Sequence, residues 1–492
     1  PLEPSKPGVY VSGAFSGPKD IPTTVAEASG AASKAANDIF PARNSLITEV
    51  ELPPERDVEG EEPRLGVFIC KCGINIGGVV DVPSVVEYAK TLPNVAYSEW
   101  NLYTCSQDTQ ERIKQNIKDH NLNRVIVASC TPRTHEPLFQ NTTREGGLNQ
   151  YLFEMANIRD QCSWIHMHEP EEATEKAKDL VRMAIAKARL LEPLTKSEIP
   201  VTQRALVVGG GISGMTAALD IADQGYMTYI VEKEKQLGGI ANRLKFTLWN
   251  EDVPKELARM VDRVEKHENI RTFTDEHIEY IEGYVGNFRT KLESMDLELE
   301  HGVVILATGG KEYKPTEYMY GKDDRVLTQL EFEEQLDKGK DIPDSAVFIQ
   351  CVGSRNEEHP WCSRVCCGAS VKQALKIKEL NPKAKVYILF RDMRTYSFKE
   401  DAYKEASEKG VIFIRFEDDD PPEVKKKGKK LLVYIDDDML DEKLEIEADR
   451  LVLAAAILPP EENEVFAQFL KVPITKDGFF LEAHMKLRPV EF

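Results

Sequence analysis

Cysteines are the residues of this chain best suited to chemistry, and one group of them is closely spaced. The group follows the pattern C-x10-C-x3-CC and consists of Cys351, Cys362, Cys366 and Cys367. Thiolates bind iron-sulfur clusters and zinc alike. A disulfide between Cys366 and Cys367 is the alternative, but it would leave the other two cysteines without a role. The spacing therefore predicts a sulfur-ligated centre, and a nearby flavin would favour a redox centre over zinc.

Four other cysteines stand at the ends of successive predicted strands. The pattern predicts strands at 65–70, 95–101 and 124–130, with helices at 82–92 and 106–120 between them. This βαβαβ order indicates a parallel sheet, whose right-handed crossovers bring the carboxyl ends of the strands to one edge. We therefore expect a second sulfur site there, formed by Cys70, Cys72, Cys105 and Cys130. The alternative is that these four cysteines are small residues of the core. Cys162 is either a fifth packed thiol or a ligand in place of one of the four.

A glycine-rich turn follows the predicted strand that begins at Arg204. Gly209, Gly211 and Gly214 fit G-x-G-x-x-G, in which the glycines permit a tight turn, close approach to a pyrophosphate and close helix packing. The helix that begins there would face the phosphates with its N-terminus. Glu232 ends the next strand, where its carboxylate can accept both ribose hydroxyls. The segment therefore predicts a dinucleotide site.

Later glycines favour FAD at this site. A pair of glycines follows the acidic residue in QLGGIANR, and a later strand ends in ATGG, as in a flavoprotein with two dinucleotide-binding domains. A nicotinamide domain would begin near Ser345, but cysteines stand where its glycine fingerprint would be, so nicotinamide binding is unsupported. The cofactor-binding residues that we predict here are Gly209, Gly211, Ser213, Gly214, Glu232, Lys233, Gly238, Gly239, Thr308 and Gly309.

Composition excludes several classes of protein. The chain has 492 residues, enough for about three domains, with 41% hydrophobic residues and a formal net charge of −20. Its longest apolar run, 451–458, is too short to span a membrane. The negative charge disfavours nucleic acid and anionic lipid as partners. The chain opens on Pro rather than on a secretory signal, so we expect a cytoplasmic protein. The charged run at 417–438 is predicted to be a solvated hairpin without a binding role.

Several motifs together resemble the A subunit of heterodisulfide reductase over residues 64–492. They are GVFICKCGINI, NLYTCSQD, VASCTPRTHEPLF, YLFEMANIRDQCSW, GGGISGMTAA and CVGSR…CSRVCC. The resemblance implies FAD and two 4Fe-4S clusters, one on each of the two cysteine sets named above. It further implies an electron-transfer subunit of an oligomeric complex, in which the flavin can bifurcate electron pairs. The implied partners are the B/C-type subunits, a hydrogenase or formate dehydrogenase module that feeds electrons, and ferredoxin.

The chain departs from this family in two ways. No CxxCxxCxxxC run of a ferredoxin module occurs, so the outlet to ferredoxin lies elsewhere or is absent. Residues 1–40 resemble the closing segment of the same FAD domain, although they precede it. We favour a chain cut from a tandem of two such modules; the alternative is a circular permutation that completes the flavin site of 203–492. The candidate flavin contacts in this segment are Gly13, Gly17, Pro18 and Asp20.

The expected fold is α/β, with an N-terminal parallel βαβ iron-sulfur domain followed by a thioredoxin-reductase-like flavoprotein of two dinucleotide-binding domains. The expected boundaries are a closing segment at 1–40, a linker at 41–63, the iron-sulfur domain at 64–195, the first FAD part at 203–310, an inserted nicotinamide-domain-like region with the second cluster at 311–460, and an incomplete return to the FAD domain at 461–492. The rival function is an NAD(P)H-dependent flavoprotein disulfide reductase that uses Cys366 and Cys367. An assembly scaffold with degenerate cofactor sites is a third interpretation.

Overall fold

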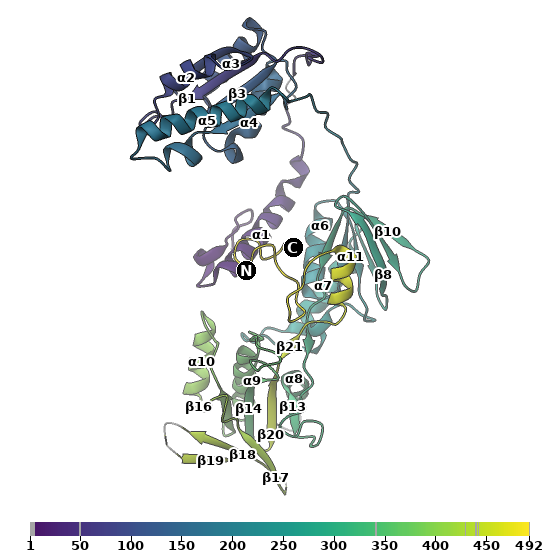
Figure 1. The fold of residues 1–492 in the computed structure, drawn as a ribbon. Coiled ribbons are helices and arrows are strands. Elements are labelled where there is room, and N and C mark those ends of the chain that lie inside the picture. Colours follow the sequence, from purple (N-terminus) through teal and green to yellow (C-terminus); the bar gives the residue numbers. More distant parts are fainter. Residues whose placement is uncertain are drawn as a thin grey trace. The chain divides into compact units, whose positions relative to one another are not determined.

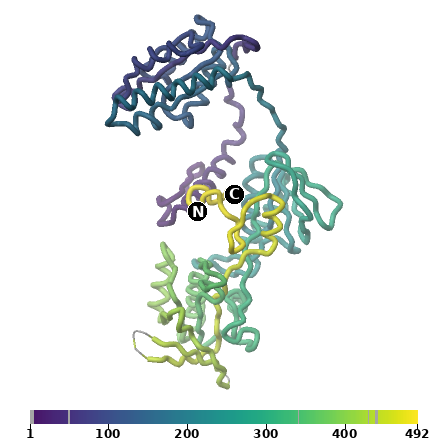
Figure 2. The backbone as a smooth tube through the Cα atoms, in the orientation of Figure 1, coloured from purple at the N-terminus to yellow at the C-terminus, as the bar shows by residue number. Residues whose placement is uncertain are grey.

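The computed structural model describes residues 5–48, 51–339, 342–428, 430–437, 440 and 442–491. The chain forms two compact units. Unit 1 comprises Pro1–Ser45 and Pro200–Phe492, and unit 2 comprises Leu46–Ile199. Figure 2 traces the chain from the first segment of unit 1 into unit 2 and back again. No helix among the described residues is long and apolar enough to cross a membrane.

Unit 2 is built on a parallel sheet of four strands in the order β2-β1-β3-β4 (Figure 1). Its strands are β1 (Leu65–Cys70), β2 (Val95–Asn101), β3 (Arg124–Ser129) and β4 (Phe153–Asn157). Its helices are α2 (Val82–Lys90), α3 (Gln107–Asp119), α4 (Pro132–Glu145), the π-helical turn η3 (Arg159–Ser163) and α5 (Pro170–Ala188). The three predicted strands and the parallel pairing are confirmed, whereas β4 was not predicted.

Helices cover both faces of this sheet, which explains why β1 and β3 are buried throughout and mostly apolar. Apolar residues of α2 and α5 pack on the face that carries Val67 and Ile69. Residues of α3 and α4 pack on the opposite face against Phe68. With both faces covered, the carboxyl edge of the sheet is where side chains at the strand ends can form a site.

The part of unit 1 that carries the predicted nucleotide site is also centred on a parallel sheet, in the order β11-β5-β6-β7. Its elements are β5 (Arg204–Val208), α6 (Ile212–Asp223), β6 (Met227–Val231), η4 (Gly239–Arg243), α7 (Val253–Lys266), β7 (Ile270–Phe273), β11 (Val303–Leu306) and α11 (Asn463–Leu470). Residues of α6 and α7 cover one face. The other face packs against α11 and an antiparallel sheet of β8 (Ile278–Tyr284), β9 (Asn287–Leu292) and β10 (Glu298–His301).

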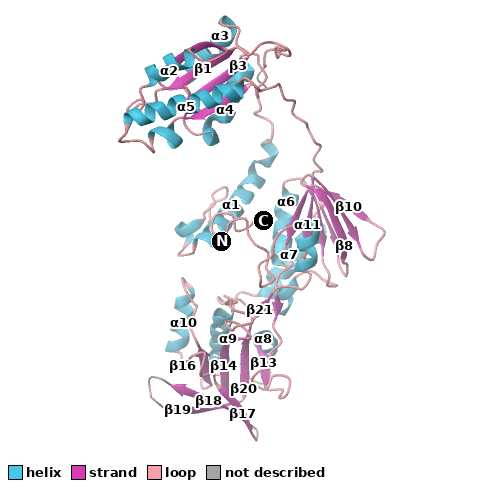
Figure 3. Ribbon diagram, in the orientation of Figure 1, coloured by secondary structure: helices cyan, strands magenta, loops and turns pink. Residues whose placement is uncertain are grey.

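The inserted region has a five-stranded parallel sheet, in the order β13-β20-β14-β15-β16 (Figure 3). Its strands are β13 (Val326–Thr328), β14 (Ser345–Val352), β15 (Lys385–Phe390), β16 (Val411–Arg415) and β20 (Arg450–Ala455). The helices α8 (Gln329–Asp337), α9 (Cys366–Leu380) and α10 (Lys399–Glu408) pack on one face. Two short antiparallel strands, β12 (Lys311–Glu312) and β21 (Ile457–Leu458), join the region to the nucleotide-binding part.

The other face of this sheet is covered by β17 (Glu423–Lys427), β18 (Lys430–Asp437) and β19 (Glu442–Ala448). The expectation of a solvated hairpin at 417–438 was therefore wrong for β18. Leu431, Val433 and Ile435 are buried because alternate residues of a strand point to one face and here meet the core. Positions 429 and 438 of that run lie outside the described residues.

The first segment of the chain packs within unit 1. It contains η1 (Gly13–Ser16), α1 (Ile21–Ile39) and η2 (Phe40–Ala42). Lys34 forms an ion pair of 2.7 Å with Asp220 of α6, and the rings of Phe40 and Tyr226 lie 5.9 Å apart. These contacts place α1 beside α6.

Candidate functional site

Unit 2 brings four of the predicted ligands to one edge of its sheet. Cys70 is the last residue of β1, Cys72 lies in the following loop, Cys105 follows β2, and Cys130 directly follows β3. Cys70 and Cys130 are buried, whereas Cys105 is exposed. The backbone N–H of Thr104 donates to the Cys70 sulfur across 3.5 Å. Four thiols from three neighbouring strand ends form the type of donor set that a sulfur-ligated cluster takes.

The charge of the Cys70 side chain acts on the other three thiols of this set. Burial raises the pKa of Cys72, Cys105 and Cys130, and the charge on Cys70 raises each of the three further. Such mutual repulsion makes a cationic metal centre a favourable occupant, because a bound metal keeps its thiolate ligands deprotonated.

Cys162 has a different environment from these four. Its side chain is fully buried in the core of unit 2, and its thiol donates to the carbonyl of Ala173 across 3.1 Å. Burial raises the pKa of this thiol to about 11. Its surroundings are those of a packed structural thiol.

The glycine-rich turn of unit 1 leaves space where a pyrophosphate would lie. Gly209 has φ +106°, and a Cβ on Gly214 would lie 1.9 Å from the carbonyl oxygen of Gly209. Both positions therefore require glycine. A Cβ on Gly211, at the N-terminus of α6, would meet no atom within 4 Å. The open position at a helix N-terminus fits a phosphate group.

The residues around this turn are held by backbone hydrogen bonds to one carboxylate. Buried Glu232 accepts from the N–H of Gly210 (2.6 Å) and of Glu234 (2.8 Å). Gly238 donates its N–H to the carbonyl of Gly210 across 2.8 Å. The remaining predicted residues are Ser213, exposed in the first turn of α6; Lys233, paired with Glu462 at 2.5 Å; and Gly239, whose Cβ would lie 3.3 Å from the Gly211 Cα.

Thr308 and Gly309 follow β11 at the carboxyl edge of the same sheet. The Thr308 hydroxyl donates to Asn463 of α11 across 3.0 Å, and the Asn463 amide donates to the carbonyl of Gly478. Gly309 has φ +75°, and a Cβ there would meet no atom within 4 Å. The late segment of the chain is thereby tied to the predicted nucleotide site.

The predicted closing segment meets the cysteine-rich part of the inserted region. The ring of Phe398 lies over Gly17, and Ser397 donates its hydroxyl to the carbonyl of Pro18 across 2.7 Å. Asp20 caps α1 by accepting from the N–H of Thr23, and its hydrogen bonds with the side chain and the backbone of Thr23 lower the pKa of Asp20. Buried Gly13 donates its N–H to Glu27.

The second cysteine set surrounds the start of α9. Cys351 lies near the end of β14 with φ +61°, Cys362 lies in the loop, and Cys366 and Cys367 begin the helix. Cys366 donates to Cys367, which raises the pKa of Cys366 and lowers that of Cys367. The charges of Cys351 and Cys362 raise the pKa of Cys366 further. All four predicted ligands of this set are free thiols.

Two arginines of this loop contact the sulfurs. The Arg355 guanidinium donates to Cys351 across 3.9 Å and to Asp392 across 2.6 Å. The backbone N–H of Arg364 donates to Cys362 across 3.4 Å. Donors of this kind stabilise negative charge on a sulfur-ligated cluster.

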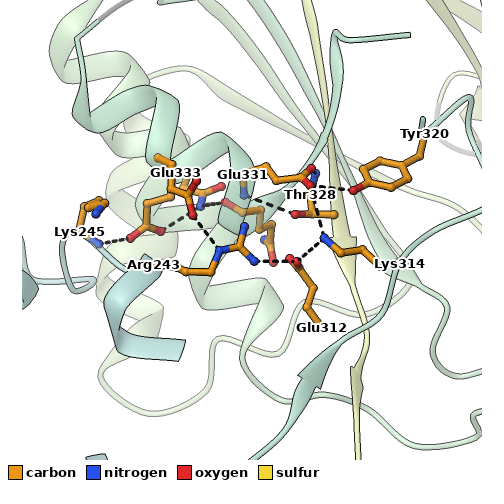
Figure 4. Close-up of polar contacts among 11 residues, drawn as sticks. Arg243, Lys245, Glu312, Lys314, Tyr320, Thr328, Glu331 and Glu333 are labelled. Atoms are coloured by element: carbon orange, nitrogen blue, oxygen red, sulfur yellow. Dashed lines mark hydrogen bonds and ion pairs between the residues drawn. The ribbon is translucent and has the colours of Figure 1, made fainter. Parts of the chain in front are cut away.

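Helix α8 connects η4 and the residues after it to α9 (Figure 4). Arg243 of η4 pairs with Glu312 and Glu334, and Lys314 pairs with Glu312 and Glu331. In the same network, buried Glu333 accepts from the N–H of Lys245 and pairs with Lys372 of α9 at 2.8 Å. Gln329 donates to the carbonyl of Cys366 across 2.9 Å. These bonds fix the cysteine helix relative to the segment that follows Gly239.

A pocket of about 570 Å³ lies where the closing segment meets the second cysteine set. Its lining residues are Pro18, Lys19, Asp20, Cys362, Arg364, Arg394, Tyr396 and Ser397. Sequence reasoning missed Arg394 and Tyr396 of this lining, because no motif marks them. It also missed Asn463 beside Thr308 and Arg159 near the first cysteine set.

Part of unit 1 matches a known protein family. Residues 203–355 match the family described as pyridine nucleotide-disulphide oxidoreductase. Two thioredoxin reductase structures are similar: one from T. acidophilum (TM-score 0.40, 16% identity, 59% of this chain and 89% of that chain) and one from Lactococcus lactis (TM-score 0.41, 20% identity, 57% and 86%).

Curated relatives extend over most of the chain. The A subunit of the H(2):CoB-CoM heterodisulfide,ferredoxin reductase of Methanothermobacter thermautotrophicus is 38% identical, over 88% of this chain and 80% of the relative. The iron-sulfur A subunit numbered 2 of the CoB--CoM heterodisulfide reductase of Methanopyrus kandleri has the same identity and coverage. The A subunit of the H(2)/formate:CoB-CoM heterodisulfide,ferredoxin reductase of Methanococcus maripaludis is 32% identical, over 87% and 80%. The chain belongs to the family of heterodisulfide reductase A subunits and is a flavin-dependent oxidoreductase of that family.

Proposed function

We propose that this chain holds one FAD and two 4Fe-4S clusters and transfers electrons as a subunit of a heterodisulfide-reductase-like complex. Unit 2 would hold one cluster on Cys70, Cys72, Cys105 and Cys130, and unit 1 would hold the flavin and a second cluster on Cys351, Cys362, Cys366 and Cys367. A bound flavin would supply exchange between electron pairs and single electrons.

The geometry of the glycine-rich turn supports FAD binding. The pyrophosphate would lie against the open position at Gly211, and Glu232 would direct its remaining acceptor positions to the ribose. Thr308 and Gly309 stand at the same sheet edge. In this proposal Pro18 and Asp20 contact the flavin from the closing segment.

The observation that carries the proposal is the shared pocket in unit 1. Pro18 and Asp20, which we predict to contact the flavin, line the same pocket as Cys362, which we predict to ligate a cluster. A flavin that reaches this pocket would lie within electron-transfer range of the cluster. Arg355 and the N-terminus of α9 would stabilise the added negative charge.

The partners follow from the names of the relatives. Those names give H2, formate, ferredoxin and the CoB-CoM heterodisulfide as the reactants of the relatives' complexes. We propose that this chain likewise accepts electrons from a hydrogenase or formate dehydrogenase module, bifurcates them at the flavin, and passes them to B/C-type subunits and to ferredoxin. Its cytoplasmic location stays a prediction.

The rival function, an NAD(P)H-dependent disulfide reductase, rests on the adjacent thiols of Cys366 and Cys367. Anaerobic titration of the full chain with NADH or NADPH separates the two functions. Our proposal expects a flavin that NADH and NADPH leave oxidised and that dithionite reduces together with paramagnetic clusters. Stoichiometric bleaching of the flavin by either nucleotide, with no cluster signal after dithionite, would establish the rival.

A further inference from the structure

The hinge of unit 1, formed by β12 and β21, joins the inserted region to the sheet that contains β5. The chain enters the inserted region through β12 and leaves it through β21, and the two strands pair over two residues each. A lone two-stranded ribbon is marginally stable at best in water. Further contacts must therefore hold the hinge in place.

The cysteine loop, residues 352–365, bonds both backbone groups of Ile457 in β21. The indole N–H of Trp361 donates to the carbonyl of Ile457 across 3.0 Å. The N–H of Ile457 donates to the hydroxyl of Ser363 across 2.9 Å. Trp361 and Ser363 are the two neighbours of Cys362 in the chain, so the predicted cluster ligand stands between the two side chains that hold the hinge.

Trp361 also contacts the far side of the hinge. Its ring meets the ring of Phe479 edge to face, and the two ring centroids lie 5.3 Å apart. Phe480, the next residue, packs on the core of the sheet that contains β5. The cysteine loop therefore connects the inserted region both to the hinge strand and to a segment that is packed on the neighbouring sheet.

The backbone of the cysteine loop is strained near both of its ends. Cys351 and Arg355 have φ +61° and +59°, and Arg364 has φ +62°. Residues with a Cβ rarely adopt this left-handed conformation, and they keep it only where the surrounding structure holds them. The N–H of Arg355 donates to the carbonyl of Trp361, which is one such bond. A cluster bound at Cys362 would add a second constraint to the same loop.

We propose that the cysteine loop is a clamp on the hinge, and that a cluster bound at Cys362 holds this clamp in place. A ligand bond at Cys362 would fix the residues on either side of it, and these hold Ile457 and Phe479. Without the cluster, the hinge opens more often and the inserted region moves relative to the sheet that contains β5. Cys362 and Arg364 also line the pocket shared with the closing segment, so the clamp sets one wall of that pocket. This inference rests on the cluster assigned to unit 1 by the proposed function.

The test is amide hydrogen exchange of the full chain in its complex, purified anaerobically and followed by mass spectrometry at the hinge peptides 308–314 and 454–460. Cys366→Ser removes the unit 1 cluster and leaves the loop sequence unchanged. It should speed exchange in both peptides about tenfold, because the clamp is released. Cys105→Ser removes the unit 2 cluster and should leave hinge exchange unchanged. Iron analysis should show the loss of about four iron atoms in each variant.

Two further variants weaken the clamp while every cysteine is kept. Ser363→Ala removes the acceptor of the Ile457 amide, and Trp361→Phe keeps a ring beside Phe479 but removes the indole N–H. Each should keep its iron and flavin and speed hinge exchange about threefold, since each loses one hydrogen bond. The double variant should reach about tenfold. Trp249→Phe, at an exposed tryptophan outside the hinge, is the control and should change nothing.

Combining the two kinds of variant separates a clamp from a local packing defect. If the loop transmits the effect of the cluster, adding Cys366→Ser to the double variant should speed hinge exchange no further. Additive effects would overturn the inference, as would normal hinge exchange in Cys366→Ser once its four iron atoms are lost. Full iron in Cys366→Ser would instead overturn the cluster assignment of the proposed function.

Discussion

The carboxylate of Asp20 lies 3.0 Å from the guanidinium of Arg364, although 344 positions separate them in the chain. Asp20 is the N-cap of α1 in the closing segment, and Arg364 lies between Cys362 and Cys366. Both side chains are exposed, so solvent screens the pair and it contributes little to stability. Its importance is spatial, because it marks where the closing segment meets the second cysteine set.

Replacing Glu232 should weaken FAD binding. Glu232→Gln removes the charge that accepts from Gly210 and Glu234. In the proposed function the same carboxylate accepts from the ribose of FAD. A hydrogen bond to a charged group contributes about 1.5–3 kcal/mol, so we expect the affinity for FAD to fall about tenfold or more. Flavin released per chain and flavin fluorescence during dilution measure the effect. Glu234→Gln, an exposed neighbouring change, is the control, and equal flavin retention in both variants would contradict the role of Glu232.

Two glycines of the turn should respond differently to the same change. Gly214→Ala places a methyl group 1.9 Å from the carbonyl of Gly209 and should lower the melting temperature of unit 1 even without flavin. Gly211→Ala meets no atom within 4 Å and should fold normally but lose flavin. Calorimetry of flavin-free protein, with flavin content measured separately, distinguishes the two. A Gly211→Ala variant that binds flavin normally would place the pyrophosphate elsewhere.

Cysteine replacement should separate ligands from packed thiols. Cys366→Ser should remove about four iron atoms per chain and leave the flavin bound. Cys162→Ala should keep all the iron and lower stability by about 1 kcal/mol, because this thiol fills a core position. Iron, sulfide and flavin analysis of both variants provides the measurement. Full iron in Cys366→Ser, or loss of a cluster in Cys162→Ala, would show that the ligand sets are misassigned.

Buried His301 should make unit 1 less stable in acid. Its imidazole donates to the carbonyl of Val303 and accepts from Thr290, and burial lowers its pKa to about 4 from an ordinary value of 6.5. Between pH 4 and pH 6.5, His301 binds a proton in the unfolded chain but not in the folded chain. The stability linked to the neutral imidazole is therefore fully present above about pH 6.5 and is lost as the pH falls toward 4.

The measurement compares the unaltered chain with His301→Gln by urea unfolding at several pH values. Between pH 7 and pH 4, the free energy of unfolding of the unaltered chain should fall by up to about 3 kcal/mol more than that of the variant. Parallel pH profiles would show that His301 titrates freely in the folded protein.

The sequence predicted those elements whose residues carry a local signal. β1 is a continuous apolar run because both faces of its sheet are covered. The turn at Gly209 carries the glycine spacing G-x-G-x-x-G, which few other structures require. β4 was missed because its sequence, FEMAN, is short and only partly buried.

Other features depend on tertiary packing alone. The π-helical turn η3, which follows β4 at the edge of the first cysteine set, has no reliable sequence signal. The meeting of Asp20 with Arg364, and the pocket that they line, join segments that no local pattern relates. The hairpin of β17 and β18 was predicted, but its burial at β18 was not, because the charges that flank β18 concealed its buried residues.

The central claim is that this chain holds two four-iron clusters and one flavin. The most direct measurement is the content of iron, acid-labile sulfide and released FAD per chain after anaerobic purification of the full-length protein in its complex, with peptide mapping to assign the values to this chain. The account predicts about eight iron atoms, about eight sulfides and one FAD. About four iron atoms would show that one cysteine set has been misread, and a chain without iron or flavin would contradict the account.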